Sequence, residues 1–287
     1  MSVDRYPPIA DYALLSDCHS GALVSKDGSI DWCTFHRLEA RPVFARILDW
    51  AKAGFFRIAP LEDDYVSRRR YLPETNVLET TFETPGGTLV LTDFFAFRVS
   101  APGESGPFAH PDHQLVRLAR CTSGEVAVKV KIVPRFDYGL TTPRLEMLAD
   151  DLVVCYGGAD ALVLQSELPF ADAEHSATEG NRTLRAGEEA FVCLTYQFPH
   201  ELQPSRLSGE EVRAKLEETR ATWAAWAGRC TYDGPYREQV VRSALVLKAL
   251  TNGPTGSIVA AATTSLPEEI GGERNWTTAS RGCATRR

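Results

Sequence analysis

The sequence lacks several features that would assign it to common protein classes. No apolar run approaches the roughly 20 residues of a membrane-spanning helix. Basic residues are not in excess either: 31 Lys and Arg stand against 38 Asp and Glu, for a net charge of -7. This charge argues against a nucleic acid partner, which would need a basic face. The first eight residues include an aspartate and two prolines instead of the basic and apolar segments of a signal peptide. We therefore expect a cytoplasmic protein without a membrane or nucleic acid partner.

Cofactor and metal motifs are also missing. The 7 cysteines are scattered, odd in number and never spaced as CxxC, which argues against a disulfide framework or a zinc site. His110 and His113 are close in sequence on a proline-containing segment, but a surface pair explains them better than a metal site. There is no G-x-S-x-G elbow, no P-loop and no G-x-G-x-x-G in a βαβ setting. We expect neither a cofactor nor a metal.

What the sequence does contain is a series of short strands. Residues 9–32 predict two strands joined by a tight turn at 26–29, and residues 76–95 predict a hairpin that turns at Pro85-Gly86-Gly87. Alternating apolar residues predict a second hairpin, with strands at 113–121 and 125–133 around a turn at 122–124. Further strands are expected at 152–156, 161–166 and 190–198. Many strands at intervals of roughly 8–12 residues favour an antiparallel β-sandwich.

The pattern changes to helical at Ser208. Ser208-Gly209-Glu210-Glu211 is a capping box, and it is followed by apolar residues at helical spacing: Val212, Leu216, Thr219, Trp223 and Trp226. Residues 236–250 predict a second amphipathic helix, ended by Gly253-Pro254, with Val240, Ala244, Leu247 and Leu250 on its apolar stripe.

The segment after this helix, residues 251–276, reads TNGPTGSIVAAATTSLPEEIGGERNW. It resembles the entry to the (α/α)6 barrel of glycoside hydrolase family 15, the bacterial glucoamylase-like and trehalase-like enzymes. In that family a GG-x-RNW run leads into D-Y-R-F/Y-x-W-L-R-D-A, whose Arg-Asp pair holds the sugar. Here the match ends at Trp276.

The N-terminal part resembles the same family. Residues 11–19 (DYALLSDCH) followed by 26–32 (KDGSIDW) are similar to the opening signature of its trehalase-like N-terminal domain. Asp31-Trp32 can be a strand end with a packed indole or a sugar contact. Residues 37–49 stand where the family has R-F-D-S-P and a short helix, but Glu39 and Ala40 replace the usual Asp and Ser. Residues 53–60 (AGFFRIAP) match the strand that follows.

The last eleven residues suggest how the match is lost. When residues 277–286 are written as degenerate codons and read one base out of frame behind a G, the fixed bases allow D-Y-R-F-T-W-L-R-D-A. We infer a one-base frameshift after the Trp276 codon, in the gene or in its sequencing; a natural basic tail is the alternative. The resemblance then implies these domains: a β-sandwich over 1–205, a linker helix over 206–232, a truncated start of the (α/α)6 barrel over 233–276, and a frameshifted tail over 277–287.

The resemblance implies an inverting hydrolase that acts on α-glucosidic bonds of trehalose, maltose or a short α-glucan. Such an enzyme uses two carboxylates about 6.5–9.5 Å apart. The family's catalytic glutamates belong to later barrel helices, so we assign no catalytic residue and expect the chain alone to be inactive. The candidate substrate-binding residues are Trp276, Asn275 and Glu268, within a stretch that begins at Thr263. Glu268 and Glu269 are adjacent carboxylates, but neighbours in sequence rarely face one bond from opposite sides, so we do not expect them to be the catalytic pair.

Two alternatives remain open. The chain can be a stand-alone β-sandwich that binds a carbohydrate or a protein without catalysis, which aromatic residues grouped on an exposed sheet face would favour. It can also act together with a separately encoded barrel. Without barrel helices to cover it, the apolar face of the second helix should be an exposed patch that lowers solubility.

Overall fold

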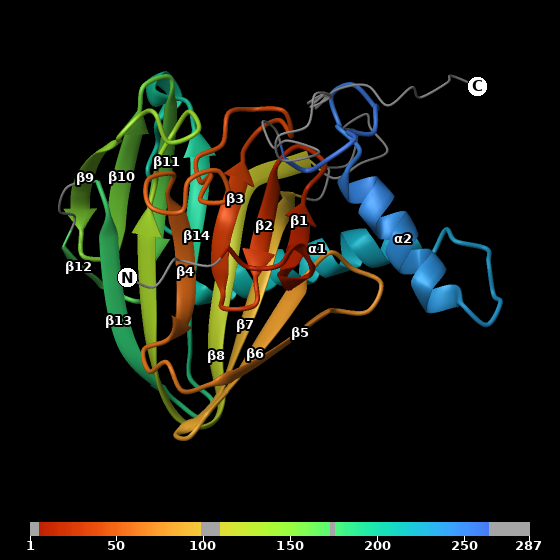
Figure 1. Cartoon of the computed structure of the whole chain (residues 1–287), viewed down its shortest axis with the longest axis horizontal. Coiled ribbons are helices and arrows are strands. Elements are labelled where there is room, and N and C mark those ends of the chain that lie inside the picture. Colours follow the sequence, from red (N-terminus) through yellow and green to blue (C-terminus); the bar gives the residue numbers. More distant parts are fainter. Residues whose placement is uncertain (1–5, 99–109, 173–175, 264–287) are drawn as a thin grey trace.

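The computed structural model describes residues 6–98, 110–172 and 176–263. Two antiparallel β-sheets face each other, and two helices follow them in sequence (Figure 1). The strands are β1 (Tyr12–Ser16), β2 (Gly21–Ser25), β3 (Ser29–Thr34), β4 (Phe55–Pro60), β5 (Val66–Tyr71), β6 (Leu78–Thr84), β7 (Gly87–Arg98), β8 (His110–Val133), β9 (Arg144–Ala149), β10 (Leu152–Gly157), β11 (Asp160–Ser166), β12 (Phe170–Asp172), β13 (Thr178–Arg185) and β14 (Glu189–Gln197). The helices are α1 (Gly209–Ala227) and α2 (Arg237–Ala249), and short 3-10 turns lie at Ile9–Asp11 and Pro199–Glu201. The predicted mainly β fold is confirmed.

The long strand β8 belongs to both sheets. Its first part pairs with β7 and β14, in a sheet of order β5-β6-β7-β8-β14-β11-β10-β9. Its second part pairs with β4 and β13, in a sheet of order β1-β2-β3-β4-β8-β13-β12. The predicted second hairpin at 113–133 was therefore wrong. At residues 122–124 the strand does not turn back; it changes partners, with a register irregularity against β7 and Gly124 at φ 67°.

Other expectations were partly right. The hairpin at 76–95 is confirmed as β6 and β7, and three later strands are confirmed as β10, β11 and β14. Residues 9–32 contain three strands instead of two. Residues 37–49 form no helix, because the backbone of Val43 and Phe44 hydrogen-bonds to Cys33 of β3 instead of to its own next turn. β5, β9, β12 and β13 were not predicted.

The core lies between the inner faces of the two sheets. In β4, Phe56 and Ile58 are fully buried, and in β8 so are Val128, Val130 and Ile132, at the alternate spacing of a strand with one inward face. Gly28 closes the β2–β3 turn against β4. Its φ is 76°, and a Cβ there would lie 2.1 Å from the carbonyl oxygen of Ile58, so both the conformation and the space require glycine.

A buried arginine ties the two sheets together. Arg117 of β8 is completely buried and pairs with Asp93 of β7 through Nε–Oδ1 (2.8 Å) and Nη2–Oδ2 (3.1 Å) contacts. Its remaining donors reach the opposite sheet, at the carbonyl oxygens of Phe56 (2.9 Å) and Gly28 (2.8 Å). Each nitrogen of the guanidinium therefore has an acceptor, which a buried charge needs.

The helices cover one side of the sandwich. The predicted capping box is present: Ser208 Oγ accepts from the Glu211 amide, and the Glu211 carboxylate accepts from the Ser208 amide. α1 packs on the outer face of β7 and β14, where Thr219 Oγ1 accepts a hydrogen bond from the Phe97 amide (3.2 Å).

α2 buries a set of apolar residues that was not predicted, on a different face from the stripe expected to be exposed. The side chains that pack against α1 and the sandwich are Val241, Leu245 and Ala249. Val240 and Leu247, placed on the stripe from the sequence, are exposed by 37% and 53%. Tyr236 is exposed as well, so the described residues leave these apolar side chains uncovered, as expected; the lower solubility stays a prediction.

Candidate functional site at the end of the sandwich

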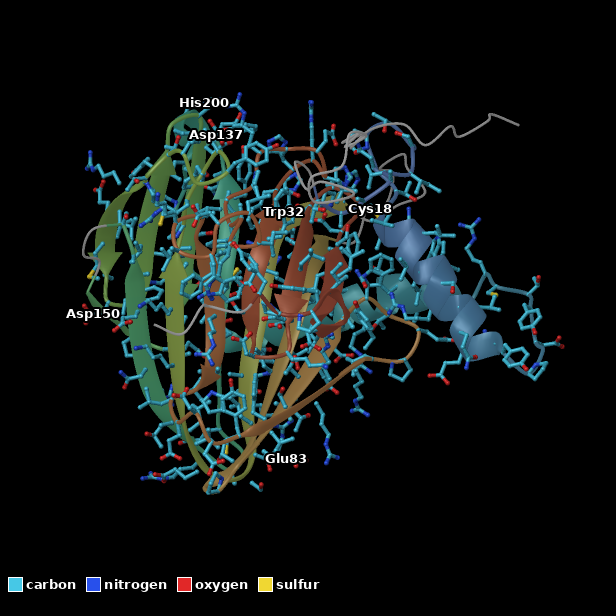
Figure 2. The ribbon with its side chains drawn as sticks, viewed as in Figure 1. Cys18, Trp32, Glu83, Asp137, Asp150 and His200 are labelled. Carbon is cyan, nitrogen blue, oxygen red and sulfur yellow. The ribbon has the colours of Figure 1, made fainter. Side chains whose placement is uncertain are left out.

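The loop that follows α2 packs on the β1–β2 loop at one end of the sandwich. The amide of Gly253 donates to the carbonyl of Cys18 (2.7 Å), and the Cys18 thiol donates to the carbonyl of Lys248 at the end of α2 (3.3 Å). Figure 2 shows Cys18 at the side of the sandwich next to α2. Five polar residues gather around this contact, and we call them the end cluster: Asp17, His19, Glu39, His113 and Asn252.

The β1–β2 loop presents Asp17 in an unusual state. Cys18 adopts a left-handed backbone conformation with φ 68°, which is uncommon outside glycine. The turn lets Asp17 Oδ1 accept hydrogen bonds from the amides of His19 (2.9 Å) and Ser20. Asp17 is only 1% exposed, and its Oδ2 has no hydrogen-bond partner within the described chain. Burial raises the pKa of Asp17, although the two amides oppose the shift.

His19, whose amide donates to this carboxyl group, has a second histidine, His113, as its ring neighbour. The rings of His19 and His113 are 6.0 Å apart between centroids, in an edge-to-face arrangement. His113 has a φ of 51°, and its Nδ1 is buried without a partner among the residues described. Burial, followed by the neighbouring His19 and His36, lowers the pKa of His113 to about 4, whereas Asp112 opposes the shift. The His113 imidazole is therefore neutral at neutral pH.

The loop after α2 completes the cluster. Asn252 is 4% exposed and donates from Nδ2 to Glu39 Oε2 (3.0 Å), while its Oδ1 has no partner in the described part of the protein. The fit is tight, since a methyl group added at Gly253 would lie 2.3 Å from Cε1 of His19. Glu39 departs from the family pattern, which argued against a role of its loop at the substrate site. It nevertheless contacts the segment that leads to Thr263.

The end cluster is chemically suited to a ligand rich in hydroxyl groups. Buried polar atoms are normally hydrogen-bonded, and leaving one without a partner costs about 1–3 kcal/mol. Here Asp17 Oδ2, His113 Nδ1 and Asn252 Oδ1 lack one in the described residues. A hydroxyl group can both donate and accept, so a polyol or an additional protein segment would satisfy such atoms.

The sequence predictions for the site fare unequally. Trp276, Asn275 and Glu268 lie outside the described residues, as does the tail at 277–287. Trp32 is completely buried against Ala45 and Ala53, so the packed-indole interpretation of Asp31-Trp32 is confirmed.

The end cluster itself was missed. Asp17 and His19 were noticed only as part of a signature, and His113 only as a neighbour of His110. Their sequence separation from Asn252 gave no signal that they meet.

Two other classes of site are absent from the described residues. No three His, Cys, Asp or Glu side chains come together there in a way that could hold a metal ion. Nor is any described helix both long and apolar enough to span a membrane.

Fold and end cluster together define a β-sandwich module whose β1–β2 loop contacts the loop that follows α2. The chain belongs to the trehalase-like N-terminal family, which it matches over residues 1–218. It is 35% identical to a trehalase of Mycolicibacterium smegmatis over 291 residues, which cover 94% of this chain and 42% of that protein. A Mycobacterium tuberculosis trehalase is also 35% identical (94% and 41% covered), and one from Thermoplasma volcanium is 32% identical (96% and 43%).

The chain thus spans about two-fifths of the length of these curated relatives. Among solved structures, a putative kojibiose phosphorylase from human microbiome aligns over 86% of this chain and 40% of its own, with 10% identity. Its TM-score of 0.43 is too low to establish a shared fold.

Proposed function

We propose that this chain is the N-terminal part of a family 15-type glycoside hydrolase that cleaves trehalose with inversion, and that the end cluster borders the sugar site. The observation that carries the proposal is the contact of the post-α2 loop with the end cluster, where Gly253 donates to Cys18 and Asn252 to Glu39, in a cluster that keeps polar atoms without described partners. The trehalase relatives support the substrate, with maltose or a short α-glucan as further candidates.

In this proposal the chain supplies positioning groups and not the catalytic pair. Inversion needs one carboxylic acid to protonate the leaving oxygen and one carboxylate to activate water, about 6.5–9.5 Å apart. The family resemblance assigns both to barrel helices beyond the sequence matched here. We therefore propose that the chain alone does not hydrolyse trehalose, with domains at 1–205, 206–232 and 233–276 and a frameshifted tail at 277–287.

A chimera tests the proposal. Residues 1–260 of this chain would replace the matched part of the M. smegmatis trehalase, and glucose release from trehalose would be measured for the chimera and for this chain alone. We expect hydrolysis only by the chimera, and at least a tenfold loss for Asp17→Asn or His113→Asn. Arg70→Ala, at an exposed ion pair with Glu79, is the matched control and should leave the rate unchanged.

Two outcomes would contradict the proposal. Hydrolysis by the purified chain alone would show that the two catalytic carboxylates need not come from later barrel helices. A chimera that is active but indifferent to the Asp17 and His113 substitutions would separate the end cluster from the sugar site. A stand-alone binding module is the second candidate function, and aromatic residues on the outer face of the sandwich support it, as described next.

A further inference from the structure

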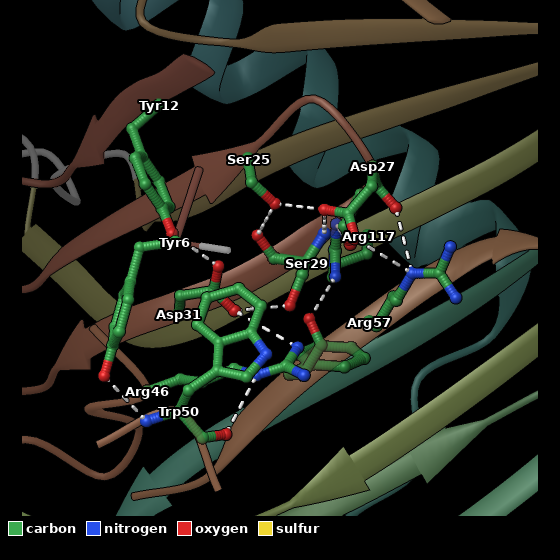
Figure 3. Close-up of polar contacts among 12 residues, drawn as sticks. Tyr6, Tyr12, Ser25, Asp27, Ser29, Asp31, Arg46, Trp50, Arg57 and Arg117 are labelled. Carbon is green, nitrogen blue, oxygen red and sulfur yellow. Dashed lines mark hydrogen bonds and ion pairs between the residues drawn. The ribbon is translucent and has the colours of Figure 1, made fainter. Parts of the chain in front are cut away.

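A pocket of about 380 Å³ opens on the outer face of the β1–β4 sheet, apart from the end cluster. Figure 3 shows four of its lining residues, Asp27, Arg46, Trp50 and Arg57. Its volume is near the lower end of the roughly 300–1,000 Å³ of small-molecule sites. None of its lining residues belongs to the end cluster. The strand periodicity explains the lining: Phe55 and Arg57 of β4 point outward, whereas Phe56 and Ile58 point into the core.

The wall of the pocket is formed by an arginine fixed between two aromatic rings. The guanidinium carbon of Arg46 lies 3.9 Å from the ring centroid of Trp50 and 4.1 Å from that of Phe55. Nε donates to the Trp50 carbonyl (3.4 Å), and Nη1 lies 3.9 Å from the carboxylate of Asp31. A stacked guanidinium has little freedom left to lose when it binds a ligand.

A buried network holds this arginine from behind. Asp31 is fully buried and accepts hydrogen bonds from Tyr12 Oη (2.8 Å) and Ser29 Oγ (2.6 Å), as Figure 3 shows. Arg46 Nη1 faces Asp31, whereas Nη2 makes no hydrogen bond to a described residue, so its N–H groups remain available to a ligand. The KDGSIDW signature thus places Asp31 to orient the pocket, while Asp27 of the same signature lines it.

The charges of the pocket are balanced. Arg57 pairs with Asp27 (3.3 Å), and Lys129 and Lys131 both contact Glu179 (3.2 and 3.7 Å). An anion would have to compete with these carboxylates, in a protein whose net charge is -7.

The pocket offers acceptors as well as donors. Asp63, an exposed residue, also lines the pocket and adds a carboxylate to its cationic side chains. Donors beside acceptors match vicinal hydroxyl groups, because each hydroxyl both donates and accepts.

Aromatic side chains supply the apolar part of the wall. Trp50 is braced by Tyr6, with ring centroids 5.3 Å apart and the Tyr6 hydroxyl accepting from the Trp50 amide (3.2 Å). Trp50 and Phe55 then present apolar area beside the polar groups, which suits the C–H surface of a sugar ring.

We infer that this pocket binds a small neutral saccharide, as a site separate from the end cluster. The inference does not rest on hydrolysis, since it concerns only binding by residues of this chain. A pocket of this size and polarity should bind with a dissociation constant of about a millimolar.

Titration of the isotopically labelled full chain, followed by TROSY NMR, tests the inference. Trehalose and maltose would be added in separate series, with sodium sulfate at matched ionic strength as the anion probe. We expect either sugar to shift the indole N–H of Trp50 and the amides of Phe55 and Arg57 in a saturable way, and sulfate to leave them in place. Trp50→Ala should weaken binding at least tenfold, whereas Tyr236→Ala, which removes an exposed aromatic just before α2, should not.

A second variant guards against a folding defect in Trp50→Ala. Asp63 is exposed, so Asp63→Asn should keep the fold and still weaken sugar binding several-fold. Shifts caused by sulfate alone would make the pocket an anion site, and no shift with any probe would remove the site altogether. Sugar-induced shifts at Cys18 and His19 without shifts at Trp50 would assign binding to the end cluster instead. These NMR results do not depend on whether the trehalase chimera described above is active.

Discussion

Two of the places where the molecule buries polar groups differ in how completely those groups are hydrogen-bonded. In the middle of the sandwich, Arg117 and Asp93 are both completely buried, and every nitrogen of the guanidinium has an acceptor. In the end cluster, Asp17 and Asn252 are almost as deeply buried, yet each keeps one oxygen without a described partner. A buried group whose donors and acceptors are all hydrogen-bonded stabilises the fold, because none of them remains for a ligand. A buried group that keeps an atom without a partner can still form a hydrogen bond to a ligand or to a neighbouring segment.

The largest loss of stability should come from breaking the fully hydrogen-bonded pair of Arg117 and Asp93. Arg117→Met leaves Asp93 buried without its cation, and we expect a loss of about 3–5 kcal/mol in the free energy of unfolding, measured by urea denaturation. The matched control is Arg70→Met, at a pair with Glu79 in which the arginine is 74% exposed, where the loss should stay below about 1 kcal/mol. Similar losses for the two variants would mean that the buried pair has no special role.

The second effect is a pH dependence of stability that His113 contributes to the end cluster. His113 has a pKa of about 4 in the folded protein, below the roughly 6.5 of an unfolded histidine, so the unfolded chain binds the proton more readily. The stability contribution is present above about pH 6.5 and is lost as the pH falls through about 4, by up to about 3 kcal/mol.

Comparison with His113→Asn isolates this contribution. Asparagine tolerates the left-handed backbone at this position, and the opposite shift of Asp17 is largely common to both proteins. The difference in unfolding free energy between wild type and variant should shrink or reverse between pH 6.5 and 4. A constant difference across that range would contradict a neutral, buried His113.

A smaller effect is expected where the two loops touch. Gly253→Ala places a methyl group against the His19 ring, which should cost about 1–3 kcal/mol and increase hydrogen exchange at residues 17–20. Gly209→Ala is the control, because the nearest atoms to its added carbon are 3.8 Å away. Unchanged exchange in Gly253→Ala would mean that the loops do not depend on each other.

The smallest change in stability should come from truncating Asn252, whose Oδ1 has no described partner. Asn252→Ala loses the hydrogen bond to Glu39 but also removes the buried Oδ1 that lacks a described partner. The two changes offset each other, so we expect less than about 1 kcal/mol by urea denaturation. A loss as large as that of Arg117→Met would show that Oδ1 is already satisfied in the folded protein.

Local chemistry predicted much of the fold. Alternation of apolar residues placed β6 and β7, and the capping box at Ser208 placed the start of α1, because both depend on residues close in sequence. Propensity could not place β5, whose exposed positions include Arg68 and Arg70, since pairing with β6 holds it in the sheet.

The sequence by itself determined the strand-rich class, the helix boundaries and the family resemblance, since these depend on neighbouring residues. Only the tertiary structure decided that β8 runs unbroken through both sheets, because an apparent turn at 122–124 becomes a change of partner when β7, β4 and β13 are in place. It also decided which face of α2 is buried, and it brought Asp17, His113 and Asn252 together. Contacts between residues this far apart in sequence leave no local pattern, so they exist only once the sheets have packed.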